Sequence, residues 1–330
     1  MDLIGVSRIR TPRSRDEIAL GPGDRPIGGG TWLYSEPQPG VDTVVDLTAL
    51  GWPELVETAE ALELAATCRL STVHGLRERD WPAAPLFGQT VEALLASWKI
   101  WNVATIGGNL CFAVPASAMV SLATALDAEL LLWRVTAAPE PTEHDEPSEP
   151  DERTVAAADW VLAPLVTALR PGEVLRSIRI PRHALEGRCA FRKIALADLG
   201  RSGVVAIARR DRPRAAPGGA GHIGTAQHAA EDDGARSGST AGDSPTSSAT
   251  ELEGAAAMHG AGGFTLSVTA ATARPHVIRW PAPPTDAELG TALDAIDDWF
   301  DDAHGAADWR EAMTRRFARE LRDELQDGPA

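Results

Sequence analysis

Two short glycine-rich segments carry the residue types that can hold a ligand through the backbone. The downstream segment, Thr-Ile-Gly-Gly-Asn at 105–109, follows Trp-Asn-Val-Ala at 101–104. Adjacent glycines let the chain turn through positive φ, leave room for close approach and point successive N–H groups in one direction, so such a loop can cradle an anion. An ordinary glycine turn is the alternative. Proline in the first turn and one apolar face predict a helix over 115–126, toward whose N-terminus the loop would lead.

The upstream segment, Pro-Ile-Gly-Gly-Gly-Thr-Trp-Leu at 26–33, places three glycines before a hydroxyl residue. Side-chain packing cannot hold such a stretch, so contact between its backbone and a ligand is the better explanation. The segment lacks the G-x-G-x-x-G spacing of a dinucleotide-binding fingerprint, and no Gly-Lys-Ser/Thr follows as in a P-loop. The two segments therefore indicate a phosphate site of another kind.

With GGGT-x-L at 28–33 and ATIGGN at 104–109, the chain resembles the FAD-binding subunits of the molybdenum hydroxylases. This family includes carbon monoxide dehydrogenase medium subunits and the flavin domain of xanthine dehydrogenase. Further segments fall in the family's order, namely VVDLTAL at 44–50, GEVLRSIRIP at 172–181, FRK at 191–193 and WREAMTRRFARELRDEL at 309–325. The likeness covers nearly the whole chain apart from two insertions.

The resemblance implies an α+β fold of the PCMH type, in which two α/β subdomains hold the flavin between them and a C-terminal domain of antiparallel sheet plus helices follows. We expect the FAD-binding domain at 1–182, with an acidic proline-rich loop inserted at 139–152. The C-terminal domain, of the carbon monoxide dehydrogenase flavoprotein type, is expected at 186–328. Its stretch 211–262 has few large apolar residues, so we expect that stretch to be disordered and dispensable for FAD binding.

The same resemblance implies FAD as the cofactor and assigns its contacts by motif. Main-chain N–H groups of the first loop and the Thr31 hydroxyl would bind the diphosphate, because a doubly charged group is best held by many fixed dipoles. The second loop would form the other wall, Val174 and Leu175 would lie beside the isoalloxazine ring, and Lys193 would stabilise the anionic reduced flavin. An exposed strand lysine is the alternative for Lys193. The expected contacts are Ile27, Gly28, Gly29, Gly30, Thr31, Trp32, Leu33, Ala104, Thr105, Gly107, Gly108, Asn109, Cys111, Ser117, Val174, Leu175 and Lys193.

Three positions depart from the family pattern. Family members often carry an acidic or small polar residue at Trp32, commonly an arginine at Trp101, and an aspartate at Ala118. The missing carboxylate removes a hydrogen-bond acceptor for the ribitol or ribose, worth about 1 kcal/mol, which would weaken FAD binding several-fold. Trp32 would compensate by stacking or would fill part of the site.

Composition excludes several classes of function. The 330 residues are 44% hydrophobic, enough for a sizeable core and about two domains. A net charge of −16 argues against nucleic acid or an anionic membrane surface as partner. The three cysteines are far apart, so they predict neither disulfides nor a zinc or iron–sulfur site, and the N-terminus predicts no signal peptide or membrane span. We expect a soluble protein of the reducing cytoplasm.

Apolar patterning predicts strands at 43–47, 62–66, 130–133, 174–180, 190–194, 203–208 and 264–268, with 174–180 paired to 190–194. A capping box at 14–17 predicts a short helix, and amphipathic spacing predicts a second helix at 91–98. A C-terminal helix carries an apolar stripe that we assign to the core rather than to a subunit contact, at Trp309, Met313, Phe317, Leu321 and Leu325.

No constellation of residues predicts an acid–base catalyst or a metal site; His74 is best explained as a turn histidine. This fits a protein whose chemistry belongs to its cofactor. The family resemblance implies a flavin-dependent oxidoreductase subunit of a complex with a molybdopterin-binding large subunit. It would accept electrons from a two-cluster iron–sulfur small subunit and pass them to an external acceptor. The alternatives are an FAD-poor structural or assembly partner of such a complex, and a stand-alone flavoprotein oxidase or reductase.

Overall fold

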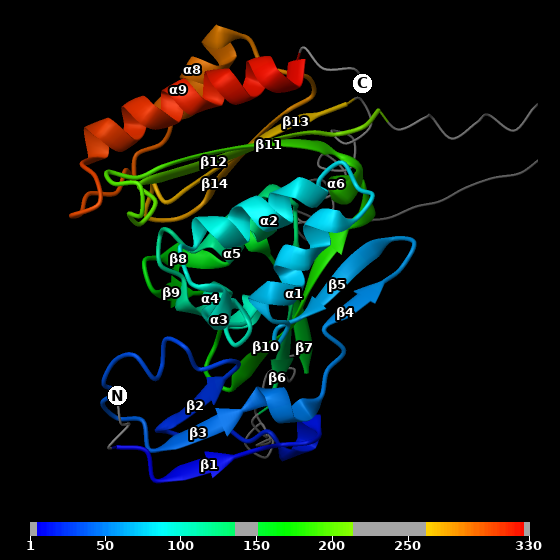
Figure 1. The fold of residues 1–330 in the computed structure, drawn as a ribbon, viewed down its shortest axis with the longest axis vertical. Helices are drawn as coiled ribbons and strands as arrows, with labels where there is room; N and C mark the ends of the chain where they lie inside the picture. Colours follow the sequence, from blue (N-terminus) through cyan, green and yellow to red (C-terminus); the bar gives the residue numbers. More distant parts are fainter. Residues whose placement is uncertain (1–4, 136–150, 214–261, 327–330) are drawn as a thin grey trace, which may run out of the picture.

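The computed structural model describes residues 5–135, 151–213 and 262–326. Within these ranges the chain forms three units, each built on one β-sheet, that follow one another along the long axis of the molecule (Figure 1). The N-terminal unit lies at one end and the C-terminal unit at the other. The expected mixture of helices and antiparallel sheets is confirmed.

The first unit is a three-stranded parallel sheet in the order β1-β3-β2, flanked by two 3₁₀ turns. Its small core of Ile18, Val45 and Leu47 is completed by Val174, which belongs to the second unit. The first unit therefore does not bury its apolar surface alone. Its elements are β1 (Arg8–Arg10), η1 (Arg15–Glu17), β2 (Asp24–Ile27), β3 (Thr43–Asp46) and η2 (Leu47–Leu50).

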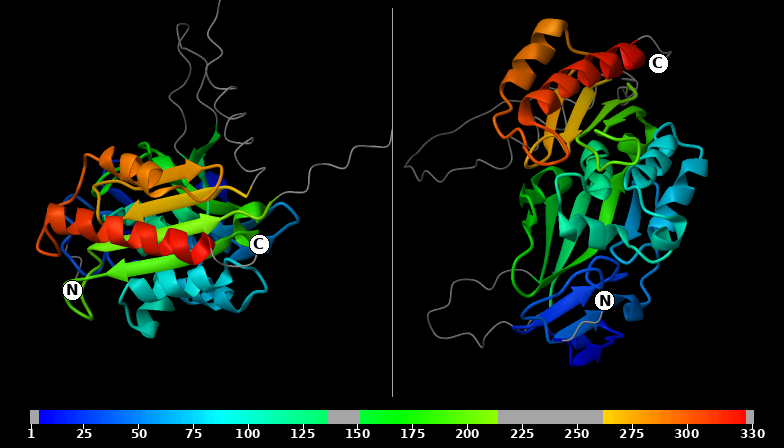
Figure 2. Two further views of the ribbon diagram at one scale, coloured as in Figure 1. Left: turned by 90° about the horizontal axis from the view of Figure 1, so that it is seen from above. Right: turned by 60° about the vertical axis from the view of Figure 1, so that its left-hand side comes forward.

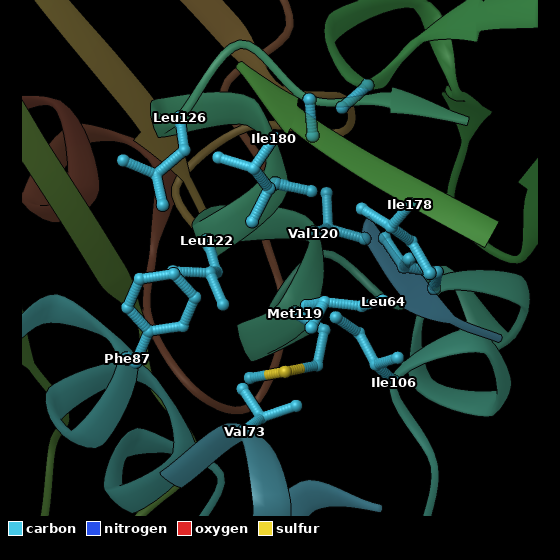
Figure 3. Close-up of a cluster of buried hydrophobic side chains, with 14 of the residues drawn as sticks. Leu64, Val73, Phe87, Ile106, Met119, Val120, Leu122, Leu126, Ile178 and Ile180 are labelled. Atoms are coloured by element: carbon cyan, nitrogen blue, oxygen red, sulfur yellow. The ribbon is translucent and has the colours of Figure 1, made fainter. Parts of the chain in front are cut away.

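The second unit is a five-stranded antiparallel sheet in the order β4-β5-β10-β6-β7, with helices packed against it. Apolar side chains from the helices and from the central strands meet in the largest core of the protein, where Phe87, Met119 and Leu122 pack toward Leu64 and Ile178 (Figure 3). Its strands are β4 (Leu55–Glu57), β5 (Ala61–Ala65), β6 (Glu129–Arg134), β7 (Glu152–Ala156) and β10 (Glu173–Pro181), and a hairpin of β8 (Val161–Ala163) and β9 (Val166–Thr167) adjoins them. Its helices are α1 (Leu70–Gly75), η3 (Leu76–Glu78), α2 (Ala84–Ala93), α3 (Trp98–Trp101), α4 (Ile106–Phe112), α5 (Ala118–Ala125) and η4 (Ala157–Asp159).

The third unit is a four-stranded antiparallel sheet in the order β11-β12-β13-β14, reached from β10 through α6 (Arg182–Glu186). Helices α8 and α9 cover its outer face (Figures 1 and 2), and its inner face packs on the second unit. The alternation is clear on β12, where Ala206 belongs to the outer core while Val205 and Ile207 belong to the core of the second unit. The elements are β11 (Arg188–Ile194), β12 (Val204–Arg210), β13 (Phe264–Thr269), β14 (His276–Trp280), α8 (Asp286–Asp294) and α9 (Ala307–Gln326).

Most predicted strands are confirmed, and so is the core assignment of the C-terminal helix, where Phe317, Leu321 and Leu325 are buried. The predicted pairing of 174–180 with 190–194 is wrong. Strand β10 lies between β5 and β6, whereas β11 pairs only with β12 among the described strands. Both strands mix apolar residues with charged ones, so their composition did not reveal which sheet each one joins.

The helix predictions need three corrections. Residues 91–98 do not form one helix, because α2 ends at Ala93, Leu95 adopts a φ of +54° and α3 begins at Trp98. The predicted helix 115–126 begins only at Ala118, after a turn in which Ser117 N–H donates to the Val114 carbonyl. Residues 15–17 form only a 3₁₀ turn without a capping bond from Ser14.

The two predicted insertions fall almost wholly outside the described residues. At their margins, Glu152 is the first residue of β7 and pairs with Trp133, so the predicted loop 139–152 extends one residue too far. Asp211 is also ordered, because it is buried and bonds Arg209. The prediction of disorder is therefore wrong for this first residue of 211–262.

Candidate cofactor-binding site

The first glycine loop leaves strand β2 with its amides free. Gly30 adopts a φ of +68°, so the chain turns back there, and Tyr34 N–H donates to the Gly30 carbonyl at 2.9 Å. Within the part of the chain that the structure describes, no group accepts a hydrogen bond from the amides of 28–33. Consecutive unpaired backbone donors form the kind of array that binds anions, so this loop fits the diphosphate of a dinucleotide.

The same loop lies directly on the segment that precedes the second glycine pair. A β-carbon would stand 2.3 Å from Thr105 Oγ1 if placed on Gly28, and 1.7 Å from the Val103 carbonyl oxygen if placed on Gly29. No side chain tolerates such distances, so both positions require glycine for close backbone approach. The structure thus brings Ile27 to Leu33 together with Ala104 and Thr105, as the sequence predicted for the two walls of one site.

The second glycine segment differs from the predicted loop. It forms the first turn of α4, whose N-cap Thr105 accepts a hydrogen bond from Gly108 N–H at 3.1 Å. The amides of Ile106 and Gly107 donate to the carbonyls of Cys68 and Ala66, each at 2.9 Å, and Asn109 N–H donates to the Thr105 carbonyl. Because these four amides are already paired, the expectation of an anion cradle here is not met. The glycine at 107 permits contact with Ala66, where a β-carbon would lie 2.6 Å from its neighbour.

Polar side chains on and near α4 already form some of their hydrogen bonds within the protein. Asn109 Oδ1 accepts a hydrogen bond from Met119 N–H at 2.9 Å, and the buried Ser117 hydroxyl donates to the Asn109 carbonyl at 3.3 Å. The Asn109 Nδ2 amide has no partner among the described residues, so it can donate to a ligand. Gly108 and Cys111 are exposed on the same helix. This face of α4 is therefore the accessible part of the second wall.

The apolar pair Val174 and Leu175 is buried at the start of β10, with exposed fractions of 2% and 3%. The preceding Glu173 fixes this end of the strand, since its carboxylate accepts two hydrogen bonds from Arg153, at 2.6 and 2.7 Å. Burial raises the pKa of Glu173, but the bonds from Arg153 and from the Arg170 amide outweigh it and hold the pKa below its usual value. Both apolar side chains are fixed by packing, so a ligand would contact them only at their margins.

Lys193 lies on β11, in the third unit. Its neighbours by alternation, Cys189 and Phe191, pack against the core of the second unit, so the Lys193 side chain leaves the sheet on its inner face. Burial lowers the pKa of Lys193. The interpretation as a fully exposed strand lysine is therefore not supported, because its side chain is partly desolvated.

Trp32 connects the first loop to the end of α4. Its ring lies 4.5 Å from that of Phe112, centroid to centroid, with the planes tilted by 36°. The indole remains 41% exposed. Phe112 was not predicted as a site residue, because only its spatial contact with Trp32 reveals its role. Ala118, in contrast, is buried at the first residue of α5 and offers no polar group.

No group of three or more potential metal ligands occurs among the described residues, and none of the described helices is long and apolar enough to cross a membrane. The chemistry of the site therefore rests on backbone donors, one side-chain amide and partly exposed aromatic rings. Such an arrangement can hold a dinucleotide cofactor where the first glycine loop meets the segment before α4.

Comparison with known proteins identifies the cofactor. The family model of the FAD binding domain in molybdopterin dehydrogenase matches residues 15–183, and the chain belongs to this family. FAD is therefore its cofactor. The chain is 32% identical over 167 residues to the carbon monoxide dehydrogenase medium chain of Afipia carboxidovorans, a match that covers 49% of this chain and 52% of that relative. The chain thus matches about half the length of this curated relative.

Solved structures extend the likeness to the whole chain. Quinoline 2-oxidoreductase from Pseudomonas putida 86 aligns with a TM-score of 0.61 at 19% identity over 98% of this chain and 99% of that one. The reconstituted CO dehydrogenase from Oligotropha carboxidovorans gives 0.65 at 20% identity over 97% of both chains. Carbon monoxide dehydrogenase from Hydrogenophaga pseudoflava gives 0.65 at 18% identity over 97% of both. At these identities the likeness establishes a common fold for all three units.

Proposed function

We propose that this chain is the FAD-binding subunit of a molybdenum hydroxylase-type oxidoreductase. It accepts electrons from an iron–sulfur partner subunit, which receives them from a molybdopterin-binding subunit. It then passes them to an external acceptor. We further propose that the FAD-binding domain ends near residue 182 and that the C-terminal domain begins near 186, on either side of α6. All three cysteines are free thiols, which agrees with a cytoplasmic location.

The single observation that carries the proposal is the set of unpaired amides at 28–33, next to the second segment of the family motif. A diphosphate carries two charges, and fixed amide dipoles bind it without the desolvation cost of buried cations. The Thr31 hydroxyl adds a donor at the turn. The family match supplies the identity of the dinucleotide.

Bound FAD supplies the electron chemistry, and the residues of this chain position and tune it. Asn109 Nδ2 is a free donor on the exposed face of α4, where it would orient a polar part of the cofactor. Lys193 carries a partly desolvated ammonium group on the inner face of the third sheet, where it would favour negative charge on a reduced ring system. Val174 and Leu175 are buried in two neighbouring cores, so a bound ring system would contact only their margins.

Two observations favour the second candidate, an FAD-poor structural partner. Ala118 offers no polar group, and the amides of 106–109 are all paired within the protein. If these losses outweigh the donors at 28–33, the chain would keep the fold and the complex without the cofactor. The two functions differ in a quantity that is easily measured, the amount of FAD bound per chain.

The test is the absorbance spectrum of the purified chain, with and without added FAD, followed by acid release of the cofactor. We expect flavin bands at about 370 and 450 nm and roughly one FAD per chain. Absence of FAD after reconstitution with excess cofactor would reject the proposal in favour of the structural partner. Turnover by the isolated flavoprotein, without other subunits, would instead indicate a stand-alone oxidase or reductase.

A further inference from the structure

Arg310, in the first turn of α9, is a charged side chain that the fold buries almost completely, with 1% of its surface exposed. Its guanidinium donates hydrogen bonds at 2.9 Å to the carbonyls of Gly305 and Gly203. It also donates to the Ala270 carbonyl and to the Asp302 carboxylate. A planar guanidinium presents its N–H groups in fixed directions, so it holds these four acceptors in one relative geometry.

One of these bonds connects Arg310 to the strand that carries Lys193. Gly203, whose carbonyl accepts from Arg310, donates its own N–H to the Ile194 carbonyl at 2.9 Å, directly after Lys193. Between these two ends the chain forms the β11–β12 loop, in which residues 196–199 are all exposed to solvent. Arg310 therefore fixes one end of an otherwise exposed loop and, through that end, the last residues of β11.

A second bond connects Arg310 to the turn between α4 and α5, on the second wall of the candidate site. Ala270 follows β13 with a φ of +62°, a conformation that a residue with a side chain adopts only when its surroundings hold it. Its carbonyl accepts from Arg310, while its N–H donates to the Pro115 carbonyl at 2.8 Å. Pro115 lies two residues before Ser117, whose hydroxyl donates to the Asn109 carbonyl. Arg310 therefore also fixes the segment that leads into α5.

The two connections leave from one side chain and end in different units of the fold. Ser202, next to Gly203 in the third unit, and Pro115 in the second unit line one cavity of about 170 Å³ together with Arg310. Stabilisation of the fold alone would require only that the buried charge be paired, and the Asp302 carboxylate does that. The bonds to the two backbone carbonyls add a definite position for two segments of the candidate site.

We propose that Arg310 is a positioning residue of the cofactor site, which sets the place of the Lys193 ammonium group relative to α4 by acting through Gly203 and Ala270. The identity of the cofactor rests on the proposed function, whereas the hydrogen bonds of Arg310 do not depend on it. Without the guanidinium the β11–β12 loop is released, and the charge of Lys193 is no longer held beside a bound ring system.

The first test is hydrogen exchange of the full-length chain without FAD, measured by mass spectrometry. Arg310→Met removes all four hydrogen bonds and keeps an unbranched side chain. We expect the amides of Gly203 and Ala270 to exchange about tenfold faster or more, relative to the amides of β6, which report unfolding of the second unit. Circular dichroism verifies that each variant is folded under the labelling conditions.

A second variant separates the two connections, and it decides the question if Arg310→Met does not fold. A β-carbon on Gly203 would lie 2.5 Å from the Trp309 ring, so Gly203→Ala moves this residue away from Arg310. The amide of residue 203 should then exchange faster, while the Ala270 amide keeps its rate relative to β6.

Asp127→Asn is the matched control, because it also weakens the contact between the second and third units. Its hydrogen bonds lie outside both connections, so any faster exchange should affect β6 and the two reporter amides alike. Unchanged relative rates in folded Arg310→Met would overturn the assignment. A selective rise at Gly203 and Ala270 in Asp127→Asn, as large as in Arg310→Met, would do the same.

With FAD bound, the reduction potential gives a readout that a purely structural role would not change. Arg310→Met should lower the potential, as Lys193→Met does, and should cause no further change in the Lys193→Met background. A folded Arg310→Met variant with bound FAD and the wild-type potential would overturn the role in the cofactor site.

The outcomes separate this inference from the flavin proposal. If the chain binds no FAD but the two reporter amides respond as expected, the flavin proposal fails while the positioning of both segments by Arg310 stands. If FAD binds and Lys193→Met lowers the potential, but Arg310→Met changes neither exchange nor potential, the positioning role fails and the flavin proposal stands.

Discussion

Gly29 and Val103 meet backbone to backbone, at a distance that leaves no space for a side chain. A β-carbon on residue 29 would lie 1.7 Å from the Val103 carbonyl oxygen. This contact joins the loop that carries the unpaired amides to the segment that leads into α4. The position of the first wall of the site relative to the second therefore depends on the absence of a side chain at residue 29.

Substitution of Gly29 by alanine should disturb both the fold and the site. The added methyl forces the loop away from Val103, and overpacking of this kind costs about 1–3 kcal/mol. Because the amides at 28–33 move with the loop, we also expect FAD content to fall several-fold. Thermal unfolding and acid release of the cofactor measure the two effects separately.

Gly290→Ala is the matched control for this substitution. Gly290 lies within α8, where a β-carbon would meet nothing within 4 Å. Alanine is a better helix former by about 1 kcal/mol, so this variant should be slightly more stable and should bind FAD normally. Normal FAD content in both variants would contradict the view that loop position governs binding.

Asp127 holds the second and third units together through two arginines. Its carboxylate bonds Arg279 and Arg209, and the Arg209 side chain is completely buried. Asp127→Asn keeps the backbone conformation, since asparagine tolerates the φ of +48° at this position. It leaves Arg209 with only one carboxylate, so we expect a loss of about 3 kcal/mol in the free energy of unfolding. Denaturant titration measures it.

The effect of Asp127 should depend on pH in a defined direction. Burial raises the pKa of Asp127, but the charge of Arg209, a hydrogen bond with His183 and the charge of Arg279 hold it well below its usual value. A carboxylate with a depressed pKa stabilises the fold above the unfolded pKa of about 3.9 and loses this contribution as the pH falls toward the folded pKa. The difference between wild type and Asp127→Asn should thus be present above about pH 5 and shrink below about pH 4. Asp294→Asn, which removes an exposed partner of Arg315, should cost less than about 1 kcal/mol at any pH.

The sequence contained the local features of the site but not its long-range contacts. The sequence indicated that the backbone at Gly28 and Gly29 is closely approached. It did not reveal that Thr105 and Val103 make these contacts. The cluster around Asp127 was missed because Arg209 lies 82 residues away in the sequence. The paired amides of α4 were missed for a similar reason, since their acceptors include Cys68 and Ala66. Local patterning predicts strands well when they alternate or are wholly apolar, but it does not reveal which strands become neighbours.

Lys193 should tune the electron affinity of bound FAD. Replacement by methionine removes the cation, so the anionic reduced flavin loses a stabilising charge and the reduction potential should fall. An interaction of about 1.4 kcal/mol corresponds to about 30 mV for a two-electron couple. Lys193→Arg keeps the charge and should keep the potential. A spectroelectrochemical titration of each reconstituted variant gives the measurement, and an unchanged potential in Lys193→Met would remove Lys193 from the flavin site.

Residues 214–261 should be dispensable for both folding and FAD binding, for a reason that lies in their flanks. The ends of β12 and β13 are neighbours, since Arg210 pairs with Phe264 and Asp211 N–H donates to the Gly263 carbonyl at 2.9 Å. A short Gly-Ser turn can therefore replace the whole segment without moving either strand. We expect the shortened protein to keep one FAD per chain and to unfold within a few degrees of the full-length protein. If it folds, as judged by circular dichroism, but purifies without flavin and cannot be reconstituted, this segment contributes to the cofactor site, and the two glycine loops alone do not form it.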